Sequence, residues 1–327
     1  MRMGDSFVHG RCVPNRGFVK LFCLQLVLAL LSSQPALALE EIIVSYAGPT
    51  ITFLPAEVAR QRGFLREQNL DIKYLLTRSE VDRAALASGN IDYTLRAGST
   101  FVSAARGLPV RIVFLGTMKP FWGLVVRPEI KSVSELKGKS LGVPGLLGSQ
   151  QISAKFILKQ HGLDPDRDVI YRVVDTGTRI AAMLSGAIDS SMMDYGEAFR
   201  AKKAGLKMLV NAADYHALLA GGVGVNIKKL REQPDQVRRF LKAMAQALKY
   251  MRENPEGLQQ VMMSWLKIDR EMAADIYRMS INNYTKNGMI DEPTLNALVT
   301  SMLAEAGITN VNVSQLVDFS LLQQALK

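Results

Sequence analysis

The chain contains one five-residue stretch twice, as Ser88-Gly89-Asn90-Ile91-Asp92 and as Ser185-Gly186-Ala187-Ile188-Asp189. The two copies lie 97 positions apart (185 − 88). A segment with helical apolar spacing precedes each copy. A short apolar stretch, an alanine-rich segment, a glycine and another apolar run follow it. This repeated order predicts one α/β unit that the chain uses twice.

Elementary conformational preferences explain the residues of the repeat. A glycine that follows a helix can adopt a positive φ without the steric cost of a Cβ atom. We therefore expect the repeated glycine to end a helix and the repeated isoleucine to begin a buried strand. We expect the aspartates, Asp92 and Asp189, to accept hydrogen bonds from turn amides. One such unit is common in α/β proteins, whereas two copies with the same downstream order indicate a duplication.

The composition is that of an ordinary globular protein, with 327 residues of which 21% are charged and 48% are hydrophobic. A chain of this length can bury a large core, and we expect two domains. The net charge of +10 favours an anionic ligand or an anionic surface. Lysines and arginines do not cluster with aromatic residues, so we expect no nucleic-acid partner.

The first 38 residues follow the pattern of an export signal. A basic stretch ends at Lys20, an apolar core spans residues 21–31, and Ala36-Leu37-Ala38 matches an A-x-A cleavage pattern. The apolar core is shorter than the roughly 18–20 residues that a membrane-spanning helix needs. We therefore expect a signal peptide over residues 1–38, cleavage near Ala38 and a periplasmic mature protein. An uncleaved anchor is the alternative.

The sequence offers little of the usual chemistry of enzymes. Both cysteines, Cys12 and Cys23, lie in the leader, so the mature chain has no disulfide, thiol nucleophile or thiolate ligand. Histidines and acidic residues do not show the spacing of a metal site, and a G-x-S-x-G motif is missing. We expect a monomer that is not an enzyme, with no metal, no cofactor and no catalytic residues.

Segment boundaries predict how the chain divides into lobes. Two stretches are hinge candidates, the turn-rich residues 128–139 and the glycine-rich residues 221–225. Lobe one is therefore predicted from residues 39–127 plus 226–327, and lobe two from residues 128–225. Apolar residues with helical spacing predict a helical C-terminal region. Its predicted helices span residues 234–253, 255–265, 270–284 and 292–306.

Several short motifs occur in an order that is found in a known family. They are Pro55-Ala56 with Ala59-Arg60, Gly63-Phe64-Leu65 with Leu70-Asp71-Ile72, Ser88-Gly89-x-Ile91-Asp92, Gly107-Leu108-Pro109-Val110, Ser132 to Val143, and Gly162-Leu163-Asp164-Pro165 with Asp168-Val169. In this order they resemble the extracytoplasmic solute-binding proteins of ABC importers. The resemblance is to the type that serves aliphatic sulfonates, taurine, nitrate and thiamine-precursor pyrimidines. Gln68-Asn69 departs from the usual Glu-Gly of that family.

The resemblance implies a type II periplasmic-binding-protein fold, with two α/β lobes joined by two hinge strands. It implies that a small-molecule solute binds between the lobes and that an inner-membrane ABC permease receives it. Helix N-termini present unpaired N–H groups and partial positive charge, which suits an anionic or zwitterionic solute. The alternative is an enzyme or a sensor ligand domain on the same fold. Pyrimidine-precursor synthases resemble it too, but they use cysteine and histidine chemistry that the mature chain lacks.

Candidate ligand-binding residues of lobe one follow its predicted strands. They are Thr50, Thr52 and Phe53 after the first strand, Arg96, Ser99 and Thr100 after the first repeat, and Trp122 near a crossing strand. Arg96 can donate two parallel N–H bonds to a carboxylate or sulfonate; a pair with Asp92 or another acid is the alternative. For Ser99 and Thr100 the alternative is N-capping. Trp122 can stack on a planar ligand or belong to the core.

Candidate residues of lobe two lie at a helix start and at a strand end. Gly148, Ser149 and Gln150 form a predicted cradle for a phosphate-like or sulfonate-like group, although no Walker motif is present. Asp194 and Tyr195 occupy the matching rim position of the second repeat, where an acid indicates an amine or a zwitterion. Trp265, in the helical C-terminal region, is predicted to be a core residue.

Overall fold

The computed structural model of the protein describes residues 38–327. Residues 1–37 of the predicted signal peptide, with its apolar core and both cysteines, fall outside this range. All the helices and strands below belong to one compact unit, Leu39–Lys327. From residue 38 onwards, no helix has both the length and the apolar character needed to cross a membrane.

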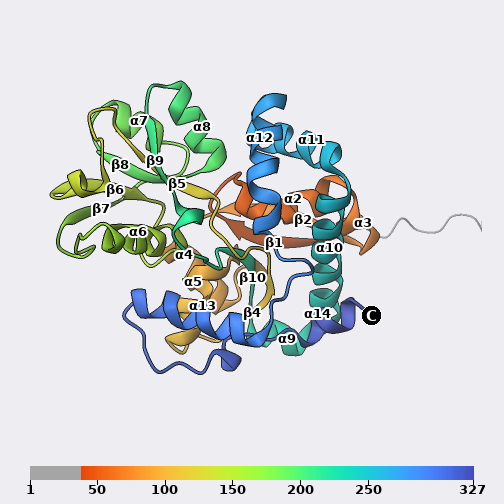
Figure 1. Ribbon diagram of the computed structural model, residues 1–327. Helices are drawn as coiled ribbons and strands as arrows, with labels where there is room; N and C mark the ends of the chain where they lie inside the picture. Colours follow the sequence, from red (N-terminus) through yellow and green to blue (C-terminus); the bar gives the residue numbers. More distant parts are fainter. Residues whose placement is uncertain (1–37) are drawn as a thin grey trace, which may run out of the picture. The chain divides into compact units, whose positions relative to one another are not determined.

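Two five-stranded sheets organise this unit (Figure 1), and they confirm the predicted pair of α/β lobes. The first has the order β2-β1-β3-β10-β4 and the second the order β7-β6-β8-β5-β9. In each sheet the fourth strand of this order runs antiparallel to both neighbours. The strands are β1 (Glu40–Tyr46), β2 (Leu70–Leu76), β3 (Tyr93–Arg96), β4 (Val110–Leu115), β5 (Trp122–Val126), β6 (Lys139–Val143), β7 (Val169–Val173), β8 (Ser190–Asp194), β9 (Lys207–Asn211) and β10 (Gly221–Asn226).

The antiparallel strand of each sheet comes from an unexpected part of the chain. Strand β5 pairs within the second sheet, although we expected it to end lobe one. Strand β10 pairs within the first sheet, although we expected it in lobe two. The chain therefore crosses between the sheets in residues 116–121 and 212–220, and the two hinge candidates were wrong. The glycines of β10 serve close packing, because a Cβ atom on Gly222 would overlap the carbonyl oxygen of Phe114.

The duplication extends to the register of the strands. Val44 pairs with Tyr93 in the first sheet, and Leu141 pairs with Ser190 in the second. Leu141 lies 97 positions after Val44, and Ser190 lies 97 positions after Tyr93. The repeated glycine has a φ of 81° in the first copy and 80° in the second, as the sequence predicted. The following strands begin two residues after the repeated isoleucine rather than at it.

The repeated aspartates join strands instead of closing turns. Asp92 Oδ2 accepts a hydrogen bond from the backbone amide of Ile43 in β1, at 2.7 Å. Asp189 Oδ2 accepts from the backbone amide of Ser140 in β6 at 2.9 Å and from its hydroxyl at 2.7 Å. The prediction of turn amides was wrong, because each carboxylate accepts from an amide of the parallel neighbouring strand, β1 or β6.

Helices pack on both sheets and form most of the C-terminal region (Figure 1). They are α2 (Leu54–Gln61), α3 (Phe64–Glu67), α4 (Ser79–Ser88), α5 (Ala97–Ala105), α6 (Ser149–Gln160), α7 (Arg179–Leu184), α8 (Tyr195–Lys203), α9 (Ile227–Glu232), α10 (Pro234–Glu253), α11 (Pro255–Leu266), α12 (Arg270–Ser280), α13 (Glu292–Glu305) and α14 (Ser320–Ala325). The predicted helical C-terminal region is confirmed. Helix α13 contacts α5 of the first lobe and α6 of the second.

Replacement of Asp189 by alanine should destabilise the second sheet. The Ser140 amide would lose its acceptor in a partly buried position, which costs about 1–3 kcal/mol. Urea unfolding measures this change. Asp189→Asn keeps an acceptor oxygen and should lose less. Asp166→Ala, which removes an exposed carboxylate paired with Lys155, should change the free energy of unfolding by less than about 0.5 kcal/mol. Equal losses in all three variants would contradict the role of Asp189.

The second crossing segment carries a histidine with an unusual environment. His216 Nε2 lies 2.8 Å from Ser153 Oγ of α6, and the imidazole ring stacks on Phe156 with centroids 4.9 Å apart. Its Nδ1 is buried and has no hydrogen-bond partner within residues 38–327. Burial lowers the pKa of His216 from its usual 6.5 to about 4. The folded protein therefore keeps this ring neutral at pH values where the unfolded chain protonates it.

Acidification should weaken the fold through His216. The unfolded chain binds this proton below about pH 6.5 and the folded chain only near pH 4, so stability falls as the pH drops between these values. The loss should reach about 2 kcal/mol, allowing for partial exposure of the ring. Urea unfolding at pH 7.5 and 4.5 measures it. His216→Gln should reduce the difference between the two pH values, and an unchanged difference would contradict this assignment.

Candidate ligand-binding cleft

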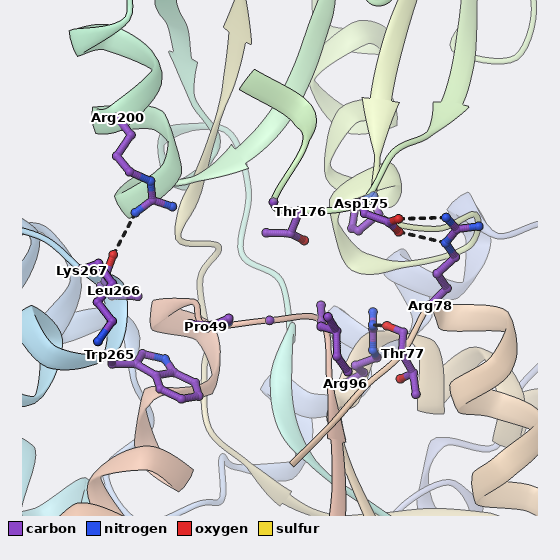
Figure 2. A pocket seen from close by; sticks show the side chains of 15 residues that line it. Pro49, Thr77, Arg78, Arg96, Asp175, Thr176, Arg200, Trp265, Leu266 and Lys267 are labelled. Atoms are coloured by element: carbon purple, nitrogen blue, oxygen red, sulfur yellow. Dashed lines mark hydrogen bonds and ion pairs between the residues drawn. The ribbon is translucent and has the colours of Figure 1, made fainter. Parts of the chain in front are cut away.

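Two adjoining cavities lie between the lobes. The inner chamber has a volume of about 60 Å³, and the outer cavity has a volume of about 610 Å³. Four residues line both and so connect them: Ala47, Arg96, Pro144 and Thr176. Figure 2 shows the outer cavity with side chains from both lobes around it. The carboxyl ends of parallel strands meet here, where α/β proteins usually bind their ligands.

Most of the predicted site residues meet in the inner chamber. Nine of the twelve line it: Thr50, Thr52, Phe53, Arg96, Ser99, Trp122, Gly148, Ser149 and Gln150. They belong to segments that are far apart in the sequence. Trp122 reaches the chamber because β5 runs antiparallel to β8, which puts its first residue opposite Asp194 at the carboxyl edge of the sheet. Gly148 is the N-cap of α6, so the predicted helix start is also found here.

The structure places the other three predicted residues outside both cavities. Thr100 donates its hydroxyl to the carbonyl oxygen of Arg96, at 2.8 Å. Asp194 caps α8 by accepting a hydrogen bond from the amide of Glu197, at 2.9 Å. The Tyr195 hydroxyl donates to Asn211 Oδ1 at 2.7 Å. Each residue thus makes a local hydrogen bond, although Oδ2 of Asp194 is buried without a partner between residues 38 and 327.

Arg96 is engaged by protein groups on most of its guanidinium. Its two terminal nitrogens donate to the hydroxyl of Ser79, at 3.2 Å, and to the carbonyl oxygen of Thr77. Its Nε lies 4.0 Å from Asp82 Oδ1. Burial lowers the pKa of Arg96 and raises the pKa of Asp82. Arg96 therefore pairs with an acid of its own lobe, which was the alternative to ligand binding, and this acid is Asp82 rather than Asp92.

Three buried donors of the chamber wall have no hydrogen-bond partner in the part of the chain from residue 38 to 327. They are Thr50 Oγ1, Trp122 Nε1 and Arg96 Nε. Buried donors in folded proteins nearly always have partners. The lining of the chamber thus contains hydrogen-bond donors that no group between residues 38 and 327 accepts from.

Contacts between the lobes flank the outer cavity on two sides (Figure 2). On one side, Arg78 donates two hydrogen bonds of 2.8 Å each to the carboxylate of Asp175. On the other side, Arg200 of α8 donates to the carbonyl oxygen of Leu266 at 3.0 Å. Arg78 and Asp175 lie 97 positions apart, so equivalent positions of the two repeats meet across the cleft. Because both side chains are more than half exposed, this pair contributes at most about 1 kcal/mol.

Trp265 packs against the core, as predicted, and its side chain also lines the outer cavity, which the sequence did not indicate. It lines the outer cavity, stacks on Tyr46 with ring centroids 5.8 Å apart, and donates from Nε1 to the carbonyl oxygen of Thr50 at 3.2 Å. Helical spacing alone does not distinguish a core position from a cavity wall. The repeat, by contrast, could have identified two further lining residues that the sequence analysis missed. Ser79 and Thr176 lie 97 positions apart, and both line the inner chamber.

Residues 50–258 match the NMT1/THI5-like family. The chain belongs to this family. It is 28% identical over 227 residues to the 4-amino-5-hydroxymethyl-2-methylpyrimidine phosphate synthase THI13 of Saccharomyces cerevisiae. The aligned residues make up 63% of this chain. That alignment spans 65% of the yeast protein, slightly under two thirds of its length. The chain is also 25% identical over 234 residues to the riboflavin-binding protein RibY of Chloroflexus aurantiacus, covering 69% of this chain and 66% of RibY.

Solved structures of binding proteins share the fold. The ligand-binding component of an ABC-type import system from Staphylococcus aureus superposes with a TM-score of 0.73 at 16% identity, over 88% of this chain and 99% of that one. The periplasmic nitrate-binding protein NrtA of Synechocystis superposes with a TM-score of 0.69 at 14% identity, over 88% of each chain. These similarities establish the type II periplasmic-binding-protein fold that the sequence predicted.

A larger side chain at Gly98 should hold the lobes apart. A Cβ atom there would overlap Ser149 Oγ of the opposite lobe and would lie 3.2 Å from Ser149 Cβ. Gly98→Val should therefore raise the radius of gyration measured by small-angle X-ray scattering. Gly177→Ala is the matched control, because no atom lies within 4 Å of the added methyl group beside the same cleft. Identical scattering from both variants would contradict the close approach of the lobes.

Proposed function

We propose that this protein is the periplasmic substrate-binding component of an ABC importer. It captures a small organic solute between its lobes and delivers it, as a monomer, to an inner-membrane permease. The observation that carries this proposal is the convergence of nine predicted residues from both lobes on one chamber. The names of RibY and of the Staphylococcus aureus protein support a binding function. The leader pattern of residues 1–38 supports export.

The size of the cleft favours an organic solute over a small inorganic ion. A cavity of about 610 Å³ lies within the usual range of roughly 300–1,000 Å³ for small-molecule sites. Trp122 lines the inner chamber and Trp265 the outer cavity, so aromatic surfaces are available at both depths. Such surfaces favour a planar solute such as a heteroaromatic ring. An anionic or zwitterionic character stays a prediction from the sequence.

An enzymatic function is the second candidate, and the yeast synthases are the observation that favours it. The cleft itself supports binding more strongly. His161 hydrogen-bonds to Tyr215 and His216 to Ser153, and neither histidine lines either cavity. Between residues 38 and 327, no group of three or more His, Cys, Asp or Glu side chains is arranged to hold a metal ion.

A ligand panel tests the proposal. The purified protein is screened by thermal shift against riboflavin, 4-amino-5-hydroxymethyl-2-methylpyrimidine, an alkanesulfonate, taurine and nitrate. A true ligand at about 100 times its Kd stabilises the folded state by about 2.7 kcal/mol, which raises the unfolding temperature by several degrees. The chain has two tryptophans, Trp122 and Trp265, and both line the cleft. The same ligand should therefore change the intrinsic fluorescence.

Two outcomes would overturn the proposal. One is the absence of a thermal shift and of a fluorescence change with every member of the panel. The other is steady release of a new product from the pyrimidine, which would establish the enzymatic candidate. Trp122→Phe is the informative control for a genuine ligand. It should abolish the part of the fluorescence change that arises in the inner chamber while leaving the response of Trp265.

A further inference from the structure

One wall residue of the inner chamber owes its orientation to a residue outside it. Gln150 lies in the first turn of α6 and lines the chamber. Its Oε1 accepts a hydrogen bond of 2.8 Å from Nη1 of Arg179. An arginine side chain carries only donors, so the amide oxygen of Gln150 must face it. The NH₂ group of the same amide then points away from Arg179.

Arg179 is fixed by a second contact. Its side chain is fully buried, and its Nε and Nη2 donate to the two carboxylate oxygens of Glu197, with Nε at 3.1 Å from Oε1. Nη1 also donates to the carbonyl oxygen of Met192. A bidentate pair of this kind sets the plane of the guanidinium as well as its position. Arg179, which does not line the chamber, thereby determines the direction of the Gln150 amide.

The rest of the chamber lining shows the same polarity. Its buried donors without a partner between residues 38 and 327 belong to Thr50 and Arg96 of lobe one and to Trp122 of lobe two. With the NH₂ group of Gln150, residues of both lobes place hydrogen-bond donors in the lining of one small space. A ligand group that itself carries donors would leave some of these atoms unpaired, which is costly in a buried site.

We propose that Arg179 is a positioning residue that fixes Gln150 as a hydrogen-bond donor and so restricts the inner chamber to ligand groups with acceptor atoms. Carbonyl oxygens, unprotonated ring nitrogens and oxyanions belong to this class. The inference rests on the proposed function, because it concerns the same cleft. It assigns a role in recognition to a residue that touches neither cavity.

A purely structural role for Arg179 predicts different behaviour. Buried ion pairs can often be replaced by apolar side chains of similar size with little loss of stability. Arg179→Met combined with Glu197→Leu, here called the apolar pair, removes both charges and leaves neither one buried alone. A structural role then predicts an unchanged affinity in a folded protein, whereas the positioning role predicts weaker binding.

The test is a double-mutant cycle on affinity. Titration calorimetry measures Kd for whichever of riboflavin, 4-amino-5-hydroxymethyl-2-methylpyrimidine, an alkanesulfonate, taurine or nitrate binds the parent protein. Gln150→Leu should raise Kd about 10-fold, as expected for the loss of one buried hydrogen bond. The apolar pair should raise Kd about 5- to 10-fold. The three substitutions together should be no worse than Gln150→Leu, because Arg179 acts through Gln150.

Arg179→Lys provides a second variant if the apolar pair does not fold. Lysine cannot form the bidentate pair that fixes the guanidinium plane, so the positioning role predicts a Kd raised about 3- to 10-fold, whereas a purely structural role predicts an unchanged Kd. Multiplied effects of Gln150→Leu and the apolar pair, or an unchanged Kd in the apolar pair or in Arg179→Lys, would each overturn the inference. Failure of every probe to bind the parent protein overturns the proposed function instead.

Discussion

A hydrogen bond accepted by each repeated aspartate ties the repeat to its sheet in both lobes. Asp92 accepts from the amide of Ile43 in β1, and Asp189 accepts from the amide of Ser140 in β6. The strands that follow the repeats, β3 and β8, pair in parallel with β1 and β6. These strands end at Arg96 and Asp194, so the loops after them lie at the carboxyl edge of each sheet.

The two lobes meet as related surfaces rather than as unrelated ones. Gly145 of lobe two packs on Ser79, while Gly48 of lobe one faces Thr176, and both partners of these contacts are related by the 97-residue offset. In an interface with two-fold symmetry, each contact between two positions recurs with the two positions swapped between the partners, as seen here. Identical charges at equivalent positions would repel near such an axis. Arg78 and Asp175 avoid this because the duplicated copies have acquired opposite charges there.

Local patterns of the sequence predicted what depends on local physics. The repeat, its positive-φ glycine and the C-terminal helices follow from residues close together in the chain, and strand ends supplied most of the chamber residues. The placement of β5 in the second sheet and of β10 in the first was not predicted, because these strands pair with strands that are distant in the sequence. The cavity role of Trp265 was missed for a related reason: its helix has the same apolar spacing whether it faces a core or a cleft.

Each lobe contains one buried pair of an acid and an arginine near the cleft, and the acid and the arginine have exchanged places between the two lobes. In the first lobe the helix carries the acid, Asp82, and the strand end carries Arg96. In the second lobe the helix at the equivalent position carries Arg179, and Glu197 supplies the acid. Each pair is balanced within its own lobe. The proposed specificity of the inner chamber therefore rests on the direction of hydrogen-bond donors, whereas a positive net charge acts at longer range.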